Sequence, residues 1–294
     1  MTVSACIFVS PVEASAVVPV AQRLREADPD APQVSVLDLG VTRGDGIFEV
    51  LGVINGRPQA VEAHLRRLAV SAAMLDLAPL DLASIEAAVH RVVELSEPVP
   101  EFAIKIVVTR GLEGGDTATC WVIPFNAGDF SRERSEGVRV VLLERGYPHD
   151  VAARAPWLLA GAKTLSYAVN KAVLREAARR GADDVLFTST DGYILEGPTS
   201  TLIAKFGSRI WTPTTAQGIL RGTTQASAFD FFADAGFATA EVLLRTDQLA
   251  EADALWLTSS SRMIVPVRSV DGADIAIDRE LTDRALSALL ARTH

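Results

Sequence analysis

The stretch APWLLAGAKTLSYAVNKAVLREAARRG, residues 155–181, sets two lysines into a run of apolar and small residues. The apolar spacing after Lys163 predicts a helix that ends at Gly181. Lys171 falls inside this helix, where its long side chain can reach water. Lys163 stands before the helix, behind a glycine and an alanine that leave room beside its ammonium group. Because confinement in an apolar site lowers the pKa of a lysine, Lys163 is the candidate nucleophile and base.

The composition is that of an ordinary globular chain and argues against several kinds of partner. Of the 294 residues, 49% are hydrophobic and 22% are charged, and the formal net charge is -9. This charge argues against a nucleic-acid partner, which requires clustered Lys and Arg. Cys6 and Cys120 form no disulfide or metal pattern, and no apolar run is long enough to span a bilayer. Since the first residues also lack the pattern of a signal peptide, we expect a cytoplasmic protein without a membrane partner.

Strand-like and helix-like patterns alternate along the chain and predict an α+β fold with two domains. Residues 1–125 have the pattern of a small α/β domain that contains a hairpin closed on Asn55 and Gly56. The polar segment 126–137 is the candidate interdomain linker. Residues 138–294 have the pattern of a larger, strand-rich domain.

Glu196 is a second unusual residue, because it ends the apolar strand pattern YILEGP. A carboxylate buried at this point would be costly unless a partner satisfied it. The alternative is a carboxylate at the end of a strand that faces solvent. The residues alone leave both interpretations open.

The segment QGILRGTTQ, residues 217–225, opens a predicted helix. Backbone N–H groups at a helix N-terminus bind anions, and its two glycines and two threonines allow close approach and add hydroxyl groups. The polar loop Thr258–Ser261 could donate further hydroxyls to the same anion. These features predict a phosphate site, and the alternative is a loop that only caps its helix.

A nucleophilic lysine, a buried carboxylate and a phosphate site together match one chemistry, that of pyridoxal 5'-phosphate (PLP). A lysine holds the aldehyde of this cofactor, and a carboxylate keeps its ring nitrogen protonated so that the ring accepts electrons. The sequence therefore predicts a PLP-dependent enzyme.

The chain resembles the fold-type IV PLP enzymes, which comprise branched-chain aminotransferases, D-amino-acid aminotransferases and 4-amino-4-deoxychorismate lyases. The resemblance rests on six segments in the family's order, which are RGDGIFEV (43–50), HLRRL (64–68), AGAKTLSY (160–167), GYILEG (192–197), GILRG (218–222) and LTSSSRMIVPV (257–267). It implies a small N-terminal α/β domain, a larger strand-rich and barrel-like C-terminal domain that binds the cofactor, and a homodimer.

The resemblance also implies roles for single residues. Lys163 would hold the cofactor aldehyde and move the proton, and Glu196 would pair with the ring nitrogen. Arg67, the last arginine of HLRRL, would bind the phosphate.

Further contacts with the cofactor would come from the later segments. The backbone N–H groups of Ile219 and Leu220 and the hydroxyl of Ser260 would bind the phosphate. Thr201 stands where the family commonly has an asparagine, and we expect it to contact the cofactor.

The substrate residues depart further from the family pattern. Arg43 replaces the usual aromatic residue before GDG, and Lys105 and Arg110 in KIVVTRGLEGG match the lyase pattern. The arginine that lyases and D-amino-acid enzymes place five residues later is Gly115 here. We expect Arg43, Lys105, Arg110 and Ser259 to contact a small amino substrate that carries carboxylates.

The leading hypothesis is a 4-amino-4-deoxychorismate lyase, which releases pyruvate to give p-aminobenzoate for folate biosynthesis. An aminotransferase of branched-chain or D-amino acids is the alternative, since it would use the same cofactor residues. A third hypothesis is a non-catalytic domain that keeps the fold. It predicts loss of the lysine, the carboxylate or the phosphate site, whereas the sequence retains all three.

Overall fold

The computed structural model describes residues 5–292, so residues 1–4 and 293–294 of the two expected domains lie outside it. The chain forms two compact units. Among the described residues, unit 1 consists of 5–128 and 162–167, and unit 2 of 129–161 and 168–292. The sequence analysis placed segment 162–167, which carries Lys163, in the second domain, whereas the structure packs it with unit 1.

Unit 1 is built on a six-stranded sheet in the order β2-β1-β6-β5-β3-β4. All of its neighbouring strands pair antiparallel. The predicted hairpin turn on Asn55 and Gly56 is confirmed, because both residues have the positive φ that this turn requires. The strands are β1 (Cys6–Val9), β2 (Leu24–Ala27), β3 (Gly46–Ile54), β4 (Arg57–Pro58), β5 (Glu101–Thr109) and β6 (Thr119–Phe125).

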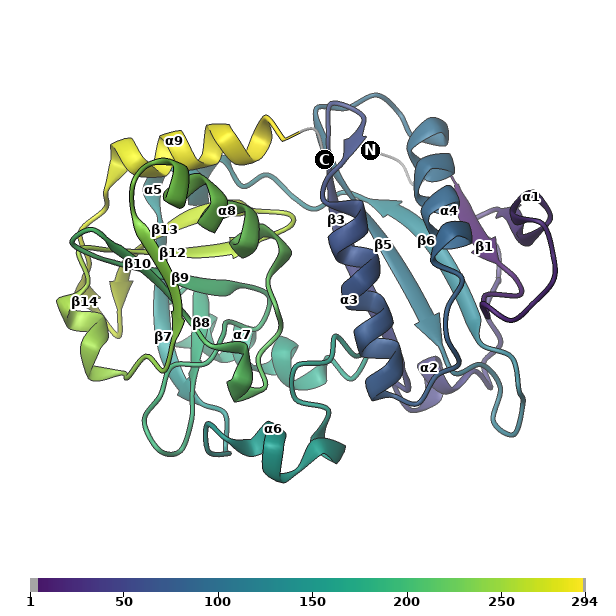
Figure 1. The fold of residues 1–294 in the computed structure, drawn as a ribbon, viewed down its shortest axis with the longest axis horizontal. Coiled ribbons are helices and arrows are strands. Elements are labelled where there is room, and N and C mark those ends of the chain that lie inside the picture. The colour runs from purple at the N-terminus through teal and green to yellow at the C-terminus, as the bar shows by residue number, and fades with distance from the viewer. Residues whose placement is uncertain (1–4, 293–294) are drawn as a thin grey trace. The chain divides into compact units, whose positions relative to one another are not determined.

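Two long helices, α3 (Val61–Met74) and α4 (Leu82–Leu95), cover one face of this sheet (Figure 1). Both have apolar residues at helical spacing, and these residues are buried. The carboxylate of Asp81 caps α4 by accepting from the Ser84 N–H. Unit 1 also contains the short helices α1 (Val20–Arg23) and α2 (Leu39–Thr42).

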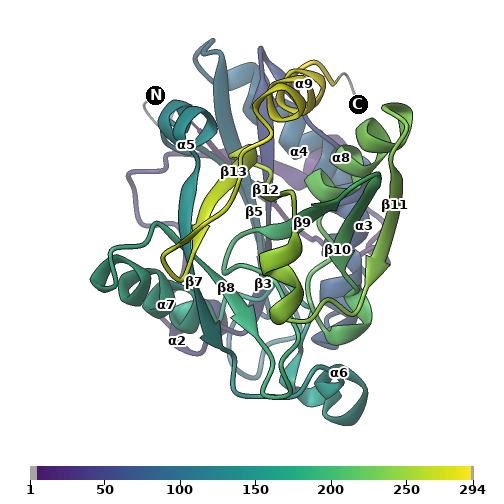
Figure 2. The same cartoon turned by 90° about the vertical axis from the view of Figure 1, so that its left-hand side faces the viewer.

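Unit 2 is built on an eight-stranded sheet in the order β11-β10-β9-β12-β13-β7-β8, with β14 beside β13 (Figure 2). The Ile194 N–H donates to the Leu244 carbonyl, just after β11, and Ile194 also bridges to Thr188 at the end of β8. These bridges connect the two edges of the sheet, so the expected barrel-like form is confirmed. The strands are β7 (Val138–Glu144), β8 (Asp184–Thr188), β9 (Thr201–Phe206), β10 (Arg209–Pro213), β11 (Ala238–Val242), β12 (Ala254–Ser259), β13 (Met263–Val270) and β14 (Ala273–Asp274).

The helices of unit 2 differ from the prediction at one important point. Helix α7 begins at Ala168 rather than directly after Lys163, because segment 162–167 pairs with a strand of unit 1. The predicted apolar side of this helix is only partly buried, since Val169 is 54% exposed. The helices are α5 (Ser131–Glu136), α6 (Val151–Arg154), α7 (Ala168–Arg179), α8 (Thr223–Asp234) and α9 (Arg279–Leu290), with 3₁₀ turns at Pro156–Leu158, Thr215–Gln217 and Asp247–Glu251. Within residues 5–292, no helix is both long and apolar enough to cross a membrane.

A buried ion pair ties the loop after β12 to the start of β8. The guanidinium of Arg262 donates to Asp184 over 2.5 Å and to Glu133 over 3.2 Å, and the Asp184 side chain is 2% exposed. We expect Asp184→Asn to lower the free energy of unfolding by about 3 kcal/mol, because it leaves a buried guanidinium charge poorly compensated. Urea denaturation measures this loss.

The neighbouring Asp183 provides the matched control. It pairs with Arg139 at the surface, where both side chains are more than one-third exposed. Asp183→Asn should therefore cost no more than about 1 kcal/mol. Equal losses in the two variants would contradict the assignment of Arg262 and Asp184 as a buried structural pair.

Candidate active site

Lys163 is carried by a segment that pairs with the edge of β3. The Phe48 N–H donates to the Lys163 carbonyl over 3.0 Å, and the Leu165 N–H donates to the Gly46 carbonyl over 2.8 Å. Gly46 permits this approach, because a Cβ at that position would come within 2.6 Å of a carbonyl of β5. The lysine of the second half of the sequence is thus anchored on the first sheet.

One face of α3 points polar groups toward this part of β3. His64, Arg67 and Ser71 follow each other at spacings of three and four residues, which places them on one side of the helix. Arg67 donates from Nε and from Nη2 to the two carboxylate oxygens of Glu49, each over 2.7 Å. His64 Nδ1 lies 2.7 Å from the same carboxylate. These bonds hold the Arg67 guanidinium in a fixed plane.

The Glu49 carboxylate is ionised although its side chain is fully buried. Burial alone would raise the pKa of Glu49, but the charge of Arg67 and hydrogen bonds from Arg67 and His64 outweigh it and hold the pKa far below its usual range. Burial lowers the pKa of His64, so its ring is neutral at neutral pH and donates its Nδ1 proton to Glu49.

Sequence reasoning gave Glu49 and His64 no role. A signal for Glu49 was present, since it is an acidic residue inside the otherwise apolar strand pattern IFEVLGVI. Such a residue must be paired when its strand is buried. The sequence did not show that its partner is Arg67, because the two lie on different elements.

An aromatic pair lies next to the amine of Lys163. Its Nζ atom is 4.6 Å from the centre of the Phe48 ring. The Tyr167 ring meets Phe48 edge-on at a centroid distance of 5.3 Å. A ring in this position stabilises the charged form of the amine.

In unit 2, Glu196 is bonded to the turn before α8. Its carboxylate accepts from the Leu220 N–H over 3.1 Å, and the residue is half-buried. This N–H thus bonds to Glu196 in the structure, and its expected contact with a phosphate stays a prediction. The Ile219 side chain is buried in a hydrophobic cluster with Leu195 and Phe187, which anchors the turn.

The N-terminus of α8 has the features of an anion site. Gly222 stands at the N-cap position, and no side chain caps the helix there. A Cβ on Gly222 would lie 2.6 Å from the hydroxyl oxygen of Thr201, so glycine at this position lets the Thr201 side chain pack directly against the start of α8. The carbonyl of Thr201 in turn accepts from the Thr258 hydroxyl over 3.2 Å.

The polar loop after β12 forms a tight turn. The Ser259 hydroxyl accepts from the Arg262 N–H over 3.2 Å, and Arg134 donates to the Arg262 carbonyl over 3.1 Å. Ser260 lies half-buried at the tip of this turn. Ser259 thus has a structural bond within the loop in addition to its expected contact with substrate.

The expected substrate residues are not equally placed to meet a substrate. Arg110 donates to Asp45 over 2.7 Å and to the Leu75 carbonyl over 2.6 Å, so its guanidinium is bonded within unit 1, and its expected contact with substrate stays a prediction. The Lys105 Nζ atom lies 5.0 Å from the centre of a phenylalanine ring. Arg43 follows α2 and its side chain is exposed, so it is the expected residue that best suits a substrate carboxylate.

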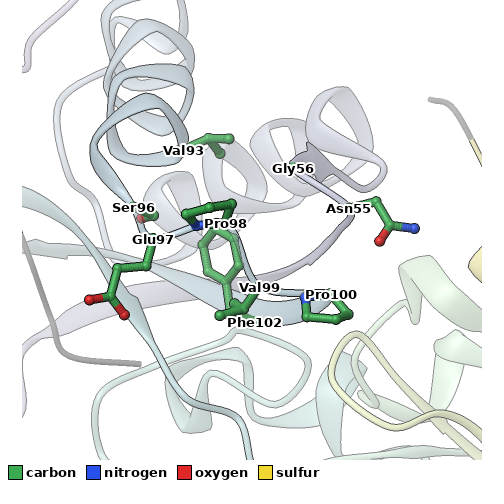
Figure 3. A pocket seen from close by; sticks show the side chains of 9 residues that line it. All are labelled: Asn55, Gly56, Val93, Ser96, Glu97, Pro98, Val99, Pro100 and Phe102. Atoms are coloured by element: carbon green, nitrogen blue, oxygen red, sulfur yellow. The ribbon is translucent and has the colours of Figure 1, made fainter.

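A cavity of about 450 Å³ lies in unit 1, and none of the expected site residues lines it (Figure 3). It is open and its wall is mostly apolar, with one carboxylate, that of Glu97. It is lined by Asn55, Gly56, Val93, Ser96, Glu97, Pro98, Val99, Pro100 and Phe102. This set contains no lysine that could hold the aldehyde of the expected cofactor.

The model of a known family, described as amino-transferase class IV, matches residues 46–270. The chain belongs to the class IV aminotransferase family. It is therefore a PLP-dependent enzyme of fold type IV, as the six segments predicted.

Individual relatives give the same assignment. The chain is 43% identical over 257 residues to the bifunctional aminodeoxychorismate lyase / D-amino acid transaminase of Mycobacterium tuberculosis, and the match covers 83% of this chain and 88% of that protein. The fold IV-transaminase CpuTA1 from Curtobacterium pusillum superposes with a TM-score of 0.93 at 48% identity, covering 98% of this chain and 99% of that one. A hypothetical aminotransferase from Mycobacterium tuberculosis, in a form with alpha-ketoglutarate and PMP bound, gives 0.87 at 38% identity and covers 93% and 98%.

The residues of this class IV enzyme fit its cofactor. Unit 1 offers an amine on Lys163 and a fixed guanidinium on Arg67. Unit 2 offers the carboxylate of Glu196 and the hydroxyl of Thr201, which lies beside Gly222 at the start of α8. An aldehyde, a ring nitrogen and a phosphate each have a matching group among them.

Proposed function

We propose that Lys163 holds the PLP aldehyde and that Glu196 pairs with the ring nitrogen. Arg67 and the first N–H groups of α8 bind the phosphate, together with the hydroxyls of Thr201 and Ser260. Phe48 of β3 bonds to the backbone of Lys163, and the next residue of the strand, Glu49, binds Arg67. This arrangement supports the assignment most directly.

We further propose that the reaction is that of a 4-amino-4-deoxychorismate lyase, which releases pyruvate and forms p-aminobenzoate for folate biosynthesis. The observation that carries this proposal is the 43% identity to a relative named as a lyase and transaminase. The exposed side chain of Arg43 supports it, since the substrate has two carboxylates.

The protein's own part in this reaction is proton transfer and charge control. Bound PLP supplies the aldehyde that takes up the substrate amine and the ring that accepts electrons. Lys163 removes the proton from the amine-bearing carbon and returns one as pyruvate leaves. Glu196 keeps the ring nitrogen protonated, and the Leu220 N–H holds the Glu196 carboxylate in place.

Transamination of branched-chain or D-amino acids is the second candidate. It begins with the same proton removal by Lys163, so one set of residues serves both reactions. The similarity to the CpuTA1 transaminase, at 48% identity over nearly the whole chain, favours it. The absence of an arginine at Gly115 counts against a purely D-specific enzyme.

We also propose that the enzyme is a homodimer that works in the cytoplasm. Exposed apolar side chains on unit 1, at Val36, Leu37, Val41 and Leu112, support a second copy as partner. The free and buried Cys6 and Cys120 are compatible with a reducing compartment. Light scattering tests the dimer by giving the mass in solution.

Arg43→Gln tests the substrate assignment. We expect KM for aminodeoxychorismate to rise by about 10-fold, because a charge-assisted bond to one carboxylate is lost. KM for a D-amino acid with a single carboxylate should stay nearly unchanged. Release of pyruvate and p-aminobenzoate measures the first reaction, and formation of glutamate from 2-oxoglutarate measures the second.

Arg66→Gln is the matched control, because its side chain is 68% exposed and lies on α3 outside the site. It should leave both KM values unchanged. If wild-type enzyme forms neither pyruvate nor p-aminobenzoate, the lyase proposal is wrong, and transamination then remains as the tested alternative.

A further inference from the structure

The backbone of Lys163 is held by hydrogen bonds on both of its sides. Its carbonyl accepts from the Phe48 N–H of β3, and its own N–H donates to the Ser71 hydroxyl over 3.1 Å. Ser71 is 1% exposed and comes from α3, 92 residues earlier in the chain. The lysine is thus bonded to a strand by its carbonyl and to a helix by its N–H.

Ser71 lies on the same face of α3 as Arg67, one helical turn further along. Four residues correspond to a rise of about 6 Å along the helix axis. Helix α3 therefore fixes the spacing between the Ser71 hydroxyl, which bonds to the lysine backbone, and the guanidinium of Arg67. Glu49 fixes the second of these groups from β3.

We propose that Ser71 is a positioning residue that sets the backbone of Lys163 for capture of an aldehyde. This inference rests on the proposed function, in which Lys163 holds the cofactor. Its consequence is that α3 fixes both the aldehyde end and the phosphate end of the cofactor site.

The roles of Ser71 and Arg67 can be tested separately, because Ser71 acts at the aldehyde end of the cofactor site and Arg67 at the phosphate end. Lys163 captures an aldehyde when its amine, having lost its proton, adds to the carbonyl carbon and one water is released. Without the Ser71 hydroxyl, the Lys163 N–H is left unsatisfied and the segment shifts to find another partner. The resulting loss of affinity for an aldehyde is the same whether or not the aldehyde carries a phosphate.

The experiment compares PLP with pyridoxal, which has the same aldehyde but no phosphate. Protein stripped of cofactor is titrated with each, and visible absorption gives the dissociation constants. Borohydride reduction and peptide mass spectrometry confirm attachment at Lys163. Ser71→Ala should raise both constants by about 10-fold, within the range that an unsatisfied buried N–H costs. Arg67→Lys should raise the constant for PLP and leave that for pyridoxal unchanged.

Ser84→Ala is the matched control for a merely structural effect. Ser84 is a fully buried serine of α4 whose hydroxyl bonds to Asp81. Its loss should lower stability without changing either dissociation constant. The proposal is overturned if Ser71→Ala binds both aldehydes like wild type, if it weakens PLP alone, or if Ser84→Ala gives the same loss. If wild-type protein captures neither aldehyde at Lys163, the proposed function itself fails.

Discussion

Lys163→Ala should abolish covalent attachment of PLP and lower kcat by roughly 10²- to 10⁴-fold, the contribution of a positioned general acid or base. The variant should keep its fold, because the bonds that hold the segment use the backbone of Lys163 and not its amine. Loss of the visible absorption of attached cofactor, together with steady-state kinetics, measures the effect.

Lys171→Ala is the control for this prediction. Lys171 lies on α7 with its side chain exposed, as the sequence analysis predicted. Removing its charge should leave both cofactor attachment and kcat unchanged. Retention of attached cofactor in Lys163→Ala, or its loss in Lys171→Ala, would show that the wrong lysine has been assigned.

Glu196→Gln should lower kcat by about 10²- to 10³-fold while the cofactor stays attached to Lys163. The amide accepts a hydrogen bond from the Leu220 N–H but carries no charge, so it cannot hold a proton on the ring nitrogen. The defect should thus appear in kcat much more than in cofactor content. Kinetics on fully loaded protein measures it.

Glu251→Gln removes an exposed carboxylate of unit 2 and should have no effect on kcat. If Glu196→Gln loses cofactor but keeps its kcat per bound cofactor, the carboxylate serves binding only. The proposed role in charge control would then be wrong.

The helices and turns that the sequence predicted share a local cause. Apolar residues at helical spacing specified α3 and α4, and the Asn55–Gly56 pair specified its hairpin turn. The start of α7 was misjudged for a non-local reason. Segment 162–167 has apolar residues that suit a helix, but its backbone bonds to β3 instead.

The hydrogen-bond partners of single residues were harder to predict than helices and turns. Arg110 was expected to contact a substrate, as Arg43 was, yet Asp45 and a backbone carbonyl accept hydrogen bonds from its guanidinium. Leu220 was expected to meet a phosphate, and its N–H binds Glu196. In each case the partner lies far away in the chain, so no local pattern could indicate it.

The sequence by itself determined the family and the cofactor, because the residue types that this chemistry needs occur in six segments in one order. The tertiary structure alone decided that Lys163 joins the first sheet, that Glu49 holds Arg67, and that Ser71 bonds to the lysine backbone. The physical reason is that hydrogen bonds and ion pairs depend on distance in space, whereas a sequence records only order along the chain.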